Sequence, residues 1–124
     1  MKKNKLFYWI ATSLVALSGL IAGVMYFSSP FISKEFGHLG FPDYFRIELG
    51  AAKIVGAFAL IMPMVSSRIK EWAYAGFAIA FISASVAHIV VDGAAAAISP
   101  LVSLLLLVLS YVYFTKLNNH KAVA

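Results

Sequence analysis

Four long apolar runs, separated by short polar segments, constrain the fold of this chain more than any other feature. The runs cover about residues 6–27, 44–65, 72–91 and 100–115. A helix needs about 20 residues to cross the hydrocarbon core of a bilayer, and the runs are close to that length. Because 62% of the residues are hydrophobic and only 12% are charged, one small soluble core could not bury the apolar surface. The sequence therefore predicts an all-α, polytopic membrane protein, a single domain over residues 1–124 that forms a four-transmembrane-helix bundle.

Residues at the ends of the runs predict where the helices begin and end. The first run is longer than the apolar part of a signal peptide, so we expect an uncleaved spanning helix. Two prolines and two glycines indicate that residues 28–43 form a loop, and residues 66–70 read as a short basic turn. Asp92-Gly93 marks the end of the third helix, and Ser99-Pro100 predicts the N-cap and first-turn proline that open the fourth.

The basic residues are divided unequally between the two sides of the predicted membrane. An even number of spans places both termini on one side, together with the basic turn. The opposite side carries only Lys34 and Arg46, whereas the side of the termini carries Lys2, Lys3, Lys5, Arg68, Lys70, Lys116 and Lys121. Because lysine and arginine concentrate on the cytoplasmic side, we expect a multi-pass protein of the cell membrane with both termini in the cytoplasm.

Charge and residue types also bear on partners and cofactors. The net charge of +5 does not indicate a nucleic-acid partner, because the basic residues flank apolar runs instead of forming a soluble basic face; the partner we expect is the lipid bilayer. The chain has no cysteine, which excludes disulfides, iron–sulfur clusters and thiolate zinc sites. Of the histidines, only His88 lies within a predicted span, while His38 lies in the loop and His120 in the tail. Nothing in this spacing requires His38 to fold back over His88, so we expect neither haem nor a metal site.

Five ionisable residues in or near the predicted spans are candidate site residues. Arg46, Glu48 and Lys53 belong to the second span, and His88 and Asp92 lie at the end of the third. Lys53 lies about 13 Å from the outer end of its helix, near the bilayer midplane, where a charge is costly unless it is paired or hydrated. Antiparallel alignment of the two helices places Glu48 at the depth of His88, and Arg46 at the depth of Asp92. The pattern predicts a polar pocket that opens outward with Lys53 at its floor; the alternative is an internal polar clamp that fixes the helix register.

Two spacings of small residues predict close helix packing. Gly19-x-x-x-Gly23 in the first run fits a close approach between helices within the monomer. In the third run, Gly76, Ala80 and Ala84 follow one another at i+4 and continue to the two polar candidates. We expect this ridge of small residues to pack tightly against a neighbouring helix.

Several segments of the chain resemble a known family. One set is Gly40-Phe41-Pro42-Asp43-Tyr44-Phe45, Leu49-Gly50 and Lys53-Ile54-Val55-Gly56. Pro63, Lys70-Glu71-Trp72-Ala73-Tyr74-Ala75-Gly76-Phe77, Ala87-His88 and Asp92-Gly93 form the second set. Together they resemble the DoxX-like family of small four-helix membrane proteins over about residues 6–115.

The resemblance implies a protein of the bacterial inner membrane. The wider DoxX group includes the membrane subunit of a thiosulfate:quinone oxidoreductase and a small partner in oxidative-stress membrane complexes. The DoxX-like branch supplies no established catalytic residues that could be assigned to this sequence. Because the chain holds no separate soluble domain, a complete oxidoreductase would need partner subunits.

Three functions remain open from the sequence. The first is a small membrane subunit of a quinone-linked redox complex, with a quinone headgroup near Lys53, Glu48 and His88, because quinone reduction couples electrons to proton uptake. The second is a non-catalytic membrane scaffold or assembly factor, in which the polar residues only clamp the helices. The third is a small-solute or proton-coupled transporter, which with four spans per chain requires a homo-oligomer. We do not expect the chain to be an enzyme on its own.

Overall fold

A computed structural model describes residues 2–123 of the chain, with side chains as far as residue 118. The elements in chain order are α1 (Lys2–Ser28), α2 (Pro30–His38), α3 (Asp43–Ile61), α4 (Ser67–Asp92), the 3₁₀-helix η1 (Ala94–Ala97) and α5 (Ile98–Val123). No strand occurs within residues 2–123, so the prediction of an all-α chain is confirmed. Lys121 and His120, which entered the sequence analysis, lie outside the part whose side chains are described.

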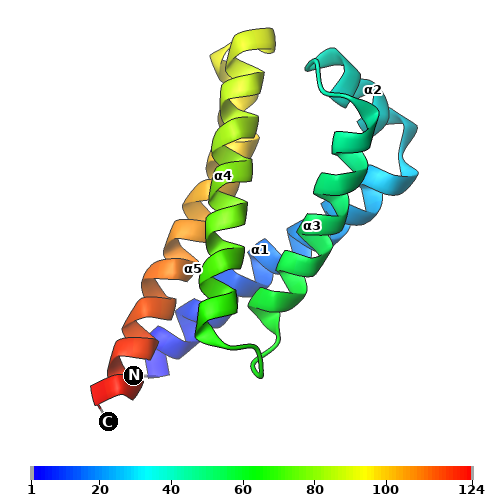
Figure 1. Cartoon of the computed structure of the whole chain (residues 1–124). Helices are drawn as coiled ribbons and strands as arrows, with labels where there is room; N and C mark the ends of the chain where they lie inside the picture. Colours follow the sequence, from blue (N-terminus) through cyan, green and yellow to red (C-terminus); the bar gives the residue numbers. More distant parts are fainter. Residues whose placement is uncertain (1, 124) are drawn as a thin grey trace.

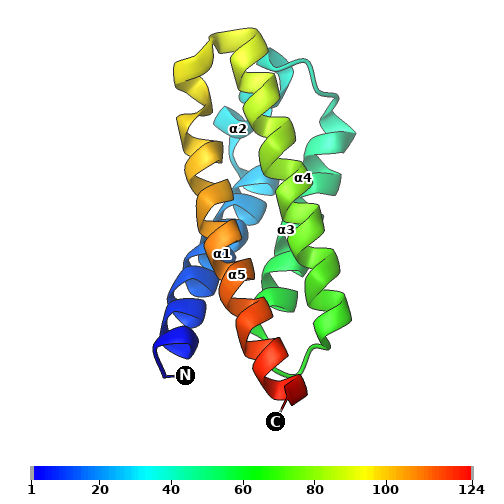
Figure 2. The same ribbon diagram turned by 90° about the vertical axis from the view of Figure 1, so that its left-hand side faces the viewer.

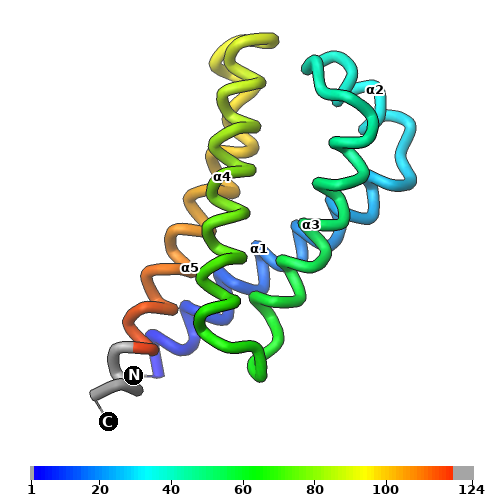
Figure 3. The backbone as a smooth tube through the Cα atoms, in the orientation of Figure 1, coloured from blue at the N-terminus to red at the C-terminus, as the bar shows by residue number. Residues whose placement is uncertain are grey.

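The four long helices run between two ends of the molecule (Figure 1). The start of α1, the end of α5 and the α3–α4 connection share one end, which we call the termini end. The short helix α2 and the α4–α5 connection lie at the opposite end, here the α2 end, as the view turned by 90° also shows (Figure 2). Helix α1 packs mainly against α3 and α5, and α4 packs against α5. The backbone tube shows α3 leaning away from α4 toward the α2 end (Figure 3).

The segment between the first two spans contains a helix that the sequence analysis did not predict. Residues 28–43 were expected to form a loop, but Pro30–His38 form α2. Pro30 occupies the first turn of this helix, where its missing N–H costs nothing and its fixed φ suits the helix. Gly40, at φ 90°, ends the segment in a conformation that favours glycine. The proline therefore starts a helix here and does not mark a loop.

The predicted ends of the other helices also need correction. Helix α1 begins at Lys2 and α5 continues to Val123, beyond the predicted limits near residues 6 and 115. Helix α3 ends at Ile61, not near residue 65, because Met62 precedes Pro63 and adopts an extended conformation. The expected basic turn at residues 66–70 is instead the first turn of α4, which Ser66 caps by accepting a hydrogen bond from the Ile69 N–H. Helix α5 already begins at Ile98, so Ser99 is not its N-cap. Its proline still lies in the first turn, where no intrahelical N–H bond is lost. The predicted stop at Asp92-Gly93 is confirmed, with Gly93 at φ 96°.

Three helical segments are long and apolar enough to cross a membrane: Lys2–Ser28, Ser67–Asp92 and Ala94–Asn118. Their outward faces expose large apolar side chains, among them Leu14, Leu17 and Ile21 of α1, Ile79, Ile82 and Val86 of α4, and Leu101, Val102 and Leu105 of α5. Such a surface is unfavourable in water and suited to lipid. The expected fourth span is the helix α3. Its 19 residues are long enough, but it is too highly charged to count with the other three, because it carries Asp43, Arg46, Glu48 and Lys53.

The core lies where α1, α3, α4 and α5 meet. Its buried residues include Tyr8, Val15, Leu60, Phe77 and Phe81, with Ala16, Ala57, Tyr74, Leu107 and Phe114 completing the cluster. A small polar network crosses this core. The Thr12 and Ser110 hydroxyls lie 2.5 Å apart, and the Tyr74 hydroxyl lies 2.7 Å from the Ser110 hydroxyl. Because the three residues belong to α1, α5 and α4, the network fixes the relative rotation of three helices.

The two predicted small-residue packing motifs have different outcomes. A Cβ added at Gly23 would lie 2.6 Å from Ile54 Cγ1 and 2.9 Å from the Gly50 carbonyl oxygen. Gly19–Gly23 therefore does pack closely within the monomer, as predicted. The expectation for the α4 ridge is wrong at Gly76, where an added Cβ would meet nothing within 4 Å. The reason is the divergence of α3 and α4, which leaves this ridge facing an open groove.

Candidate functional site

The groove beside the α4 ridge is the first candidate site. It has a volume of about 360 Å³ and lies between α3 and α4. Small residues make its walls: Ala52, Gly56 and Ala59 from α3, and Ala73, Gly76 and Ala80 from α4. Larger apolar groups, Val55 and Trp72, stand at its rim and are exposed. Small side chains on both facing helices thus leave room for a flat apolar molecule that enters from the side.

Lys53 is the one charged residue that lines this groove. Its ammonium nitrogen lies 5.0 Å from the centre of the Phe81 ring and 5.5 Å from the centre of the Tyr26 ring. Within the described part of the chain, no carboxylate forms an ion pair with it. Two aromatic faces attract the cation, but neither accepts its N–H groups in the way that an oxygen would. The ammonium group therefore keeps donors available for a ligand in the groove.

The structure does not gather the five predicted site residues into one pocket around Lys53. Arg46 turns to α1 and to its own helix: it donates 2.9 Å and 3.1 Å hydrogen bonds to Asp43 Oδ1 and a further one to the Tyr26 carbonyl oxygen. It therefore does not pair with Asp92. Glu48 is exposed on α3 and forms no ion pair among the described residues. Arg46 thus acts as a tie between α3 and α1, while Glu48 stands apart.

His88 and Asp92 form a second site, at the α2 end, together with two residues of α2. His88 Nδ1 lies 3.7 Å from Asp92 Oδ2, and His38 Nε2 lies 2.6 Å from Asp92 Oδ1. One ligand atom from each of Glu35, His88 and Asp92 lies within 4.8 Å of the other two. The nearby Asp92 carboxylate stabilises the imidazolium and raises the pKa of His38 above its ordinary value. This arrangement puts two imidazoles beside two carboxylates.

Sequence reasoning missed Glu35 and His38 because it placed both in a loop. As members of one helix they stand at i and i+3, on the same face. That spacing, with Pro30 as a helix start, was the signal that could have found them. The i, i+4 relation of His88 and Asp92 was visible in the sequence and brings these two together, as the structure shows.

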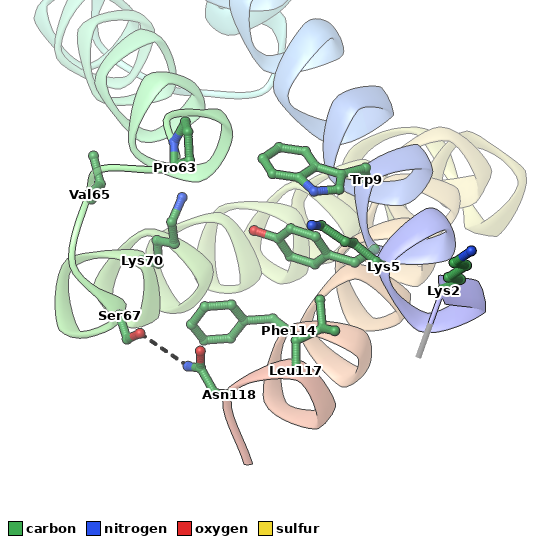
Figure 4. A pocket seen from close by; sticks show the side chains of 11 residues that line it. Lys2, Lys5, Trp9, Pro63, Val65, Ser67, Lys70, Phe114, Leu117 and Asn118 are labelled. Carbon is green, nitrogen blue, oxygen red and sulfur yellow. Dashed lines mark hydrogen bonds between the residues drawn. The ribbon is translucent and has the colours of Figure 1, made fainter. Parts of the chain in front are cut away.

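A third hollow lies at the termini end, between the starts of α1 and α4 and the last turns of α5. Its volume is about 570 Å³, and it is lined by lysines and aromatic rings, among them Lys2, Lys5, Trp9 and Phe114 (Figure 4). A hydrogen bond from the Asn118 amide to the Ser67 hydroxyl, 3.2 Å long, joins α5 to α4 at its edge. Lys70 also lines it, but the ammonium group of this residue is already engaged. It donates to the carbonyl oxygens of Ala59, Leu60 and Met62 at 2.8–2.9 Å.

The fold and the groove define a class: an all-helical protein with an apolar exterior, three membrane-compatible helices and a lateral apolar groove around one lysine. The chain belongs to the DoxX-like family, since the model of that family matches residues 10–110. No curated protein and no solved structure matches the chain. The family membership expected from the sequence is therefore confirmed, whereas the function has to be argued from the site.

Proposed function

We propose that this chain is a four-span protein of the cell membrane that binds a quinone headgroup in the α3–α4 groove as the small membrane subunit of a redox complex. In this arrangement α3 is the fourth span, and both termini face the cytoplasm. The observation that carries the proposal is Lys53, a cation without a carboxylate partner among the described residues, lining an apolar groove with exposed walls.

The positions of the charged residues of α3 lower the free-energy cost of placing this helix across a membrane. Asp43 and Arg46 satisfy one another near the start of the helix, where a membrane interface lies. Lys53 is held against the rings of Tyr26 and Phe81, which attract its charge. Glu48 is exposed, as Asp43 is, and lies about one and a half turns from the helix start, within reach of the interface. The proposal of four spans is also supported by the position of both termini and of the α3–α4 connection at one end of the molecule (Figure 1).

The groove suits a quinone for three reasons. Its walls are nearly all apolar, as a ring with an isoprenoid tail requires, and a tail can leave between the helices into the bilayer. An ammonium group of Lys53 can donate a hydrogen bond to one quinone carbonyl oxygen, and a charged donor contributes about 1.5–3 kcal/mol. Reduction of a quinone to a quinol takes up two electrons and two protons in all, and a lysine can pass a proton to the reduced oxygen. The electrons come from a partner subunit.

The test is quinone retention by the purified protein in lipid nanodiscs. Wild type, Lys53→Met and Lys34→Met are loaded with ubiquinone, washed, and the quinone bound per chain is measured by chromatography. Lys53→Met is expected to bind about tenfold more weakly, which corresponds to about 1.4 kcal/mol. Lys34→Met, which removes an exposed lysine of α2, is expected to bind like the wild type.

A second variant tests the groove without touching the charge. Gly76→Leu places a side chain into the open space beside Gly76 and should also abolish retention while the chain remains folded. If the wild type retains no more quinone than Lys53→Met and Gly76→Leu, the quinone proposal is wrong. The polar residues would then act as a clamp, as in the scaffold hypothesis.

A further inference from the structure

We propose that Glu35, His38, His88 and Asp92 bind one divalent transition-metal ion between α2 and the end of α4. The ion has the ligand preferences of Zn²⁺. These residues come from two helices, each of which supplies one imidazole and one carboxylate. The proposal concerns the α2 end of the molecule and does not depend on the Lys53 groove.

The spacing of the ligand atoms is close to that of a metal centre. Two ligand atoms of one zinc ion lie up to about 4 Å apart, since each stands about 2.0–2.2 Å from the metal. Ligand atoms of Glu35, His88 and Asp92 already lie within 4.8 Å of one another. His38 Nε2, at 2.6 Å from Asp92 Oδ1, adds the fourth donor at the same carboxylate. To place all four donors on one ion, the His38 ring has to turn from its hydrogen bond with Asp92 toward the other three ligand atoms.

His88 Nδ1 supplies an independent indication. This nitrogen is buried, and it has no hydrogen-bond partner in the described part of the chain. Its nearest carboxylate oxygen, Asp92 Oδ2, is 3.7 Å away, which is too far for a hydrogen bond. Buried polar atoms are nearly always satisfied. A metal ion between His88 and Asp92 would satisfy this nitrogen and draw the two side chains together.

The donor set selects the class of metal. Two imidazoles with two carboxylates form a mixed nitrogen and oxygen set that suits Zn²⁺ and its first-row neighbours. Mg²⁺ and Ca²⁺ prefer oxygen ligands alone, and the imidazoles argue against them. Glu35 and His38 at i, i+3 and His88 and Asp92 at i, i+4 each present two donors on one helix face.

The position of the site gives the metal a mechanical role. Helix α2 packs on α1 and α3, and the hydrogen bond between the His38 and Asp92 side chains joins it to α4. A bound ion would therefore join the α1–α2–α3 part to the end of α4 at the place where α3 and α4 diverge (Figure 1).

The test is a titration of metal-free protein in detergent with Co²⁺, followed by competition with Zn²⁺. We expect one Co²⁺ per chain, with the visible absorption of tetrahedral cobalt, and its displacement by Zn²⁺. His88→Gln and Asp92→Asn should each weaken binding at least tenfold. Glu48→Gln removes an exposed carboxylate elsewhere, His120→Gln removes the remaining histidine of the chain, and both should bind like the wild type.

A second measurement uses the unaltered protein, so that it holds even where a variant fails to fold. His38 is half exposed, with 53% of its side-chain surface accessible, so we expect it to react with diethyl pyrocarbonate when no metal is bound. One equivalent of Zn²⁺ should protect His38 and His88, as read by peptide mass spectrometry, and leave His120 reactive. Absence of stoichiometric binding, or binding that fails to protect His38, would overturn the proposal.

Discussion

Gly23 and Gly50 let α1 and α3 approach one another more closely than any larger residue would permit. A methyl group at Gly23 would meet Ile54 Cγ1 at 2.6 Å and a backbone oxygen of Gly50 at 2.9 Å. The backbone cannot yield without moving a helix, so we expect Gly23→Ala to lower the free energy of unfolding by about 1–3 kcal/mol. Denaturant titration in micelles measures this change.

Gly76→Ala is the matched control for that substitution. It also replaces a helical glycine by alanine, but an added Cβ meets nothing within 4 Å. Because alanine favours a helix over glycine by up to about 1 kcal/mol, this variant should be as stable as the wild type or more so. Equal destabilisation by both variants would mean that the contact at Gly23 is not what limits the substitution.

Thr12 is the buried polar residue on which the contact between α1 and α5 depends most directly. Its hydroxyl lies 2.5 Å from that of Ser110, which also contacts the Tyr74 hydroxyl at 2.7 Å. Thr12→Val keeps the shape and removes the hydroxyl. It should lower stability by about 0.6–1.7 kcal/mol, which spans the average and the maximum found for hydrogen bonds between membrane helices. Thr115→Val, which loses only a bond to the Val112 carbonyl of its own helix, should change stability less when both are measured by the same unfolding titration.

At the scale of elements, the Lys70 side chain of α4 caps the C-terminal end of α3. The last carbonyl groups of a helix lack intrahelical donors, and the Lys70 ammonium supplies donors to Ala59, Leu60 and Met62. The side chain is almost fully buried in doing so, at 6% exposure. We expect Lys70→Met to lower the free energy of unfolding by about 1–3 kcal/mol, since it leaves buried carbonyl oxygens unsatisfied. Lys34→Met, at an exposed position, should have no such effect.

Hydrogen exchange separates this cap from a general loss of stability. Loss of the cap frays the end of α3 first, so amides of its last turn should exchange faster in Lys70→Met while those of α1 change less. Uniform acceleration along all helices would argue that Lys70 stabilises the fold as a whole and not the end of this helix.

Hydropathy predicts most of the elements here, because a spanning run is long and its apolar character is independent of neighbours. Proline is ambiguous as a signal: Pro30 opens α2 where a loop was expected, and Pro100 lies inside the first turn of α5 instead of directly after its N-cap. The site was predictable only in part. Lys53 could be singled out by its depth, but its aromatic neighbours Tyr26 and Phe81 depend on how helices distant in sequence are rotated, which periodicity in one chain does not fix.

At the scale of the whole molecule, the cluster at the α2 end shows the same limit. Glu35 and His38 meet His88 and Asp92 only because α2 and the end of α4 lie at the same end of the molecule, within reach of each other's side chains. The contact joins residues 54 positions apart in the chain, and no spacing in the sequence predicts it. Fold class thus follows from local composition, whereas the two candidate sites arise from how the α1–α3 and α4–α5 pairs are set against each other.

The four-span arrangement can be tested directly because the chain contains no cysteine, so an introduced thiol is labelled without background. In intact cells, a membrane-impermeant maleimide should label Lys34→Cys, on the α2 end, but Lys3→Cys and Arg68→Cys only after the membrane is opened. The decisive position is Arg68, just beyond α3. If α3, with its four charged residues, does not cross the bilayer, Arg68→Cys will be labelled together with Lys34→Cys, because no span then separates them. Labelling of Lys3→Cys in intact cells would instead reverse the orientation that the lysines and arginines predict.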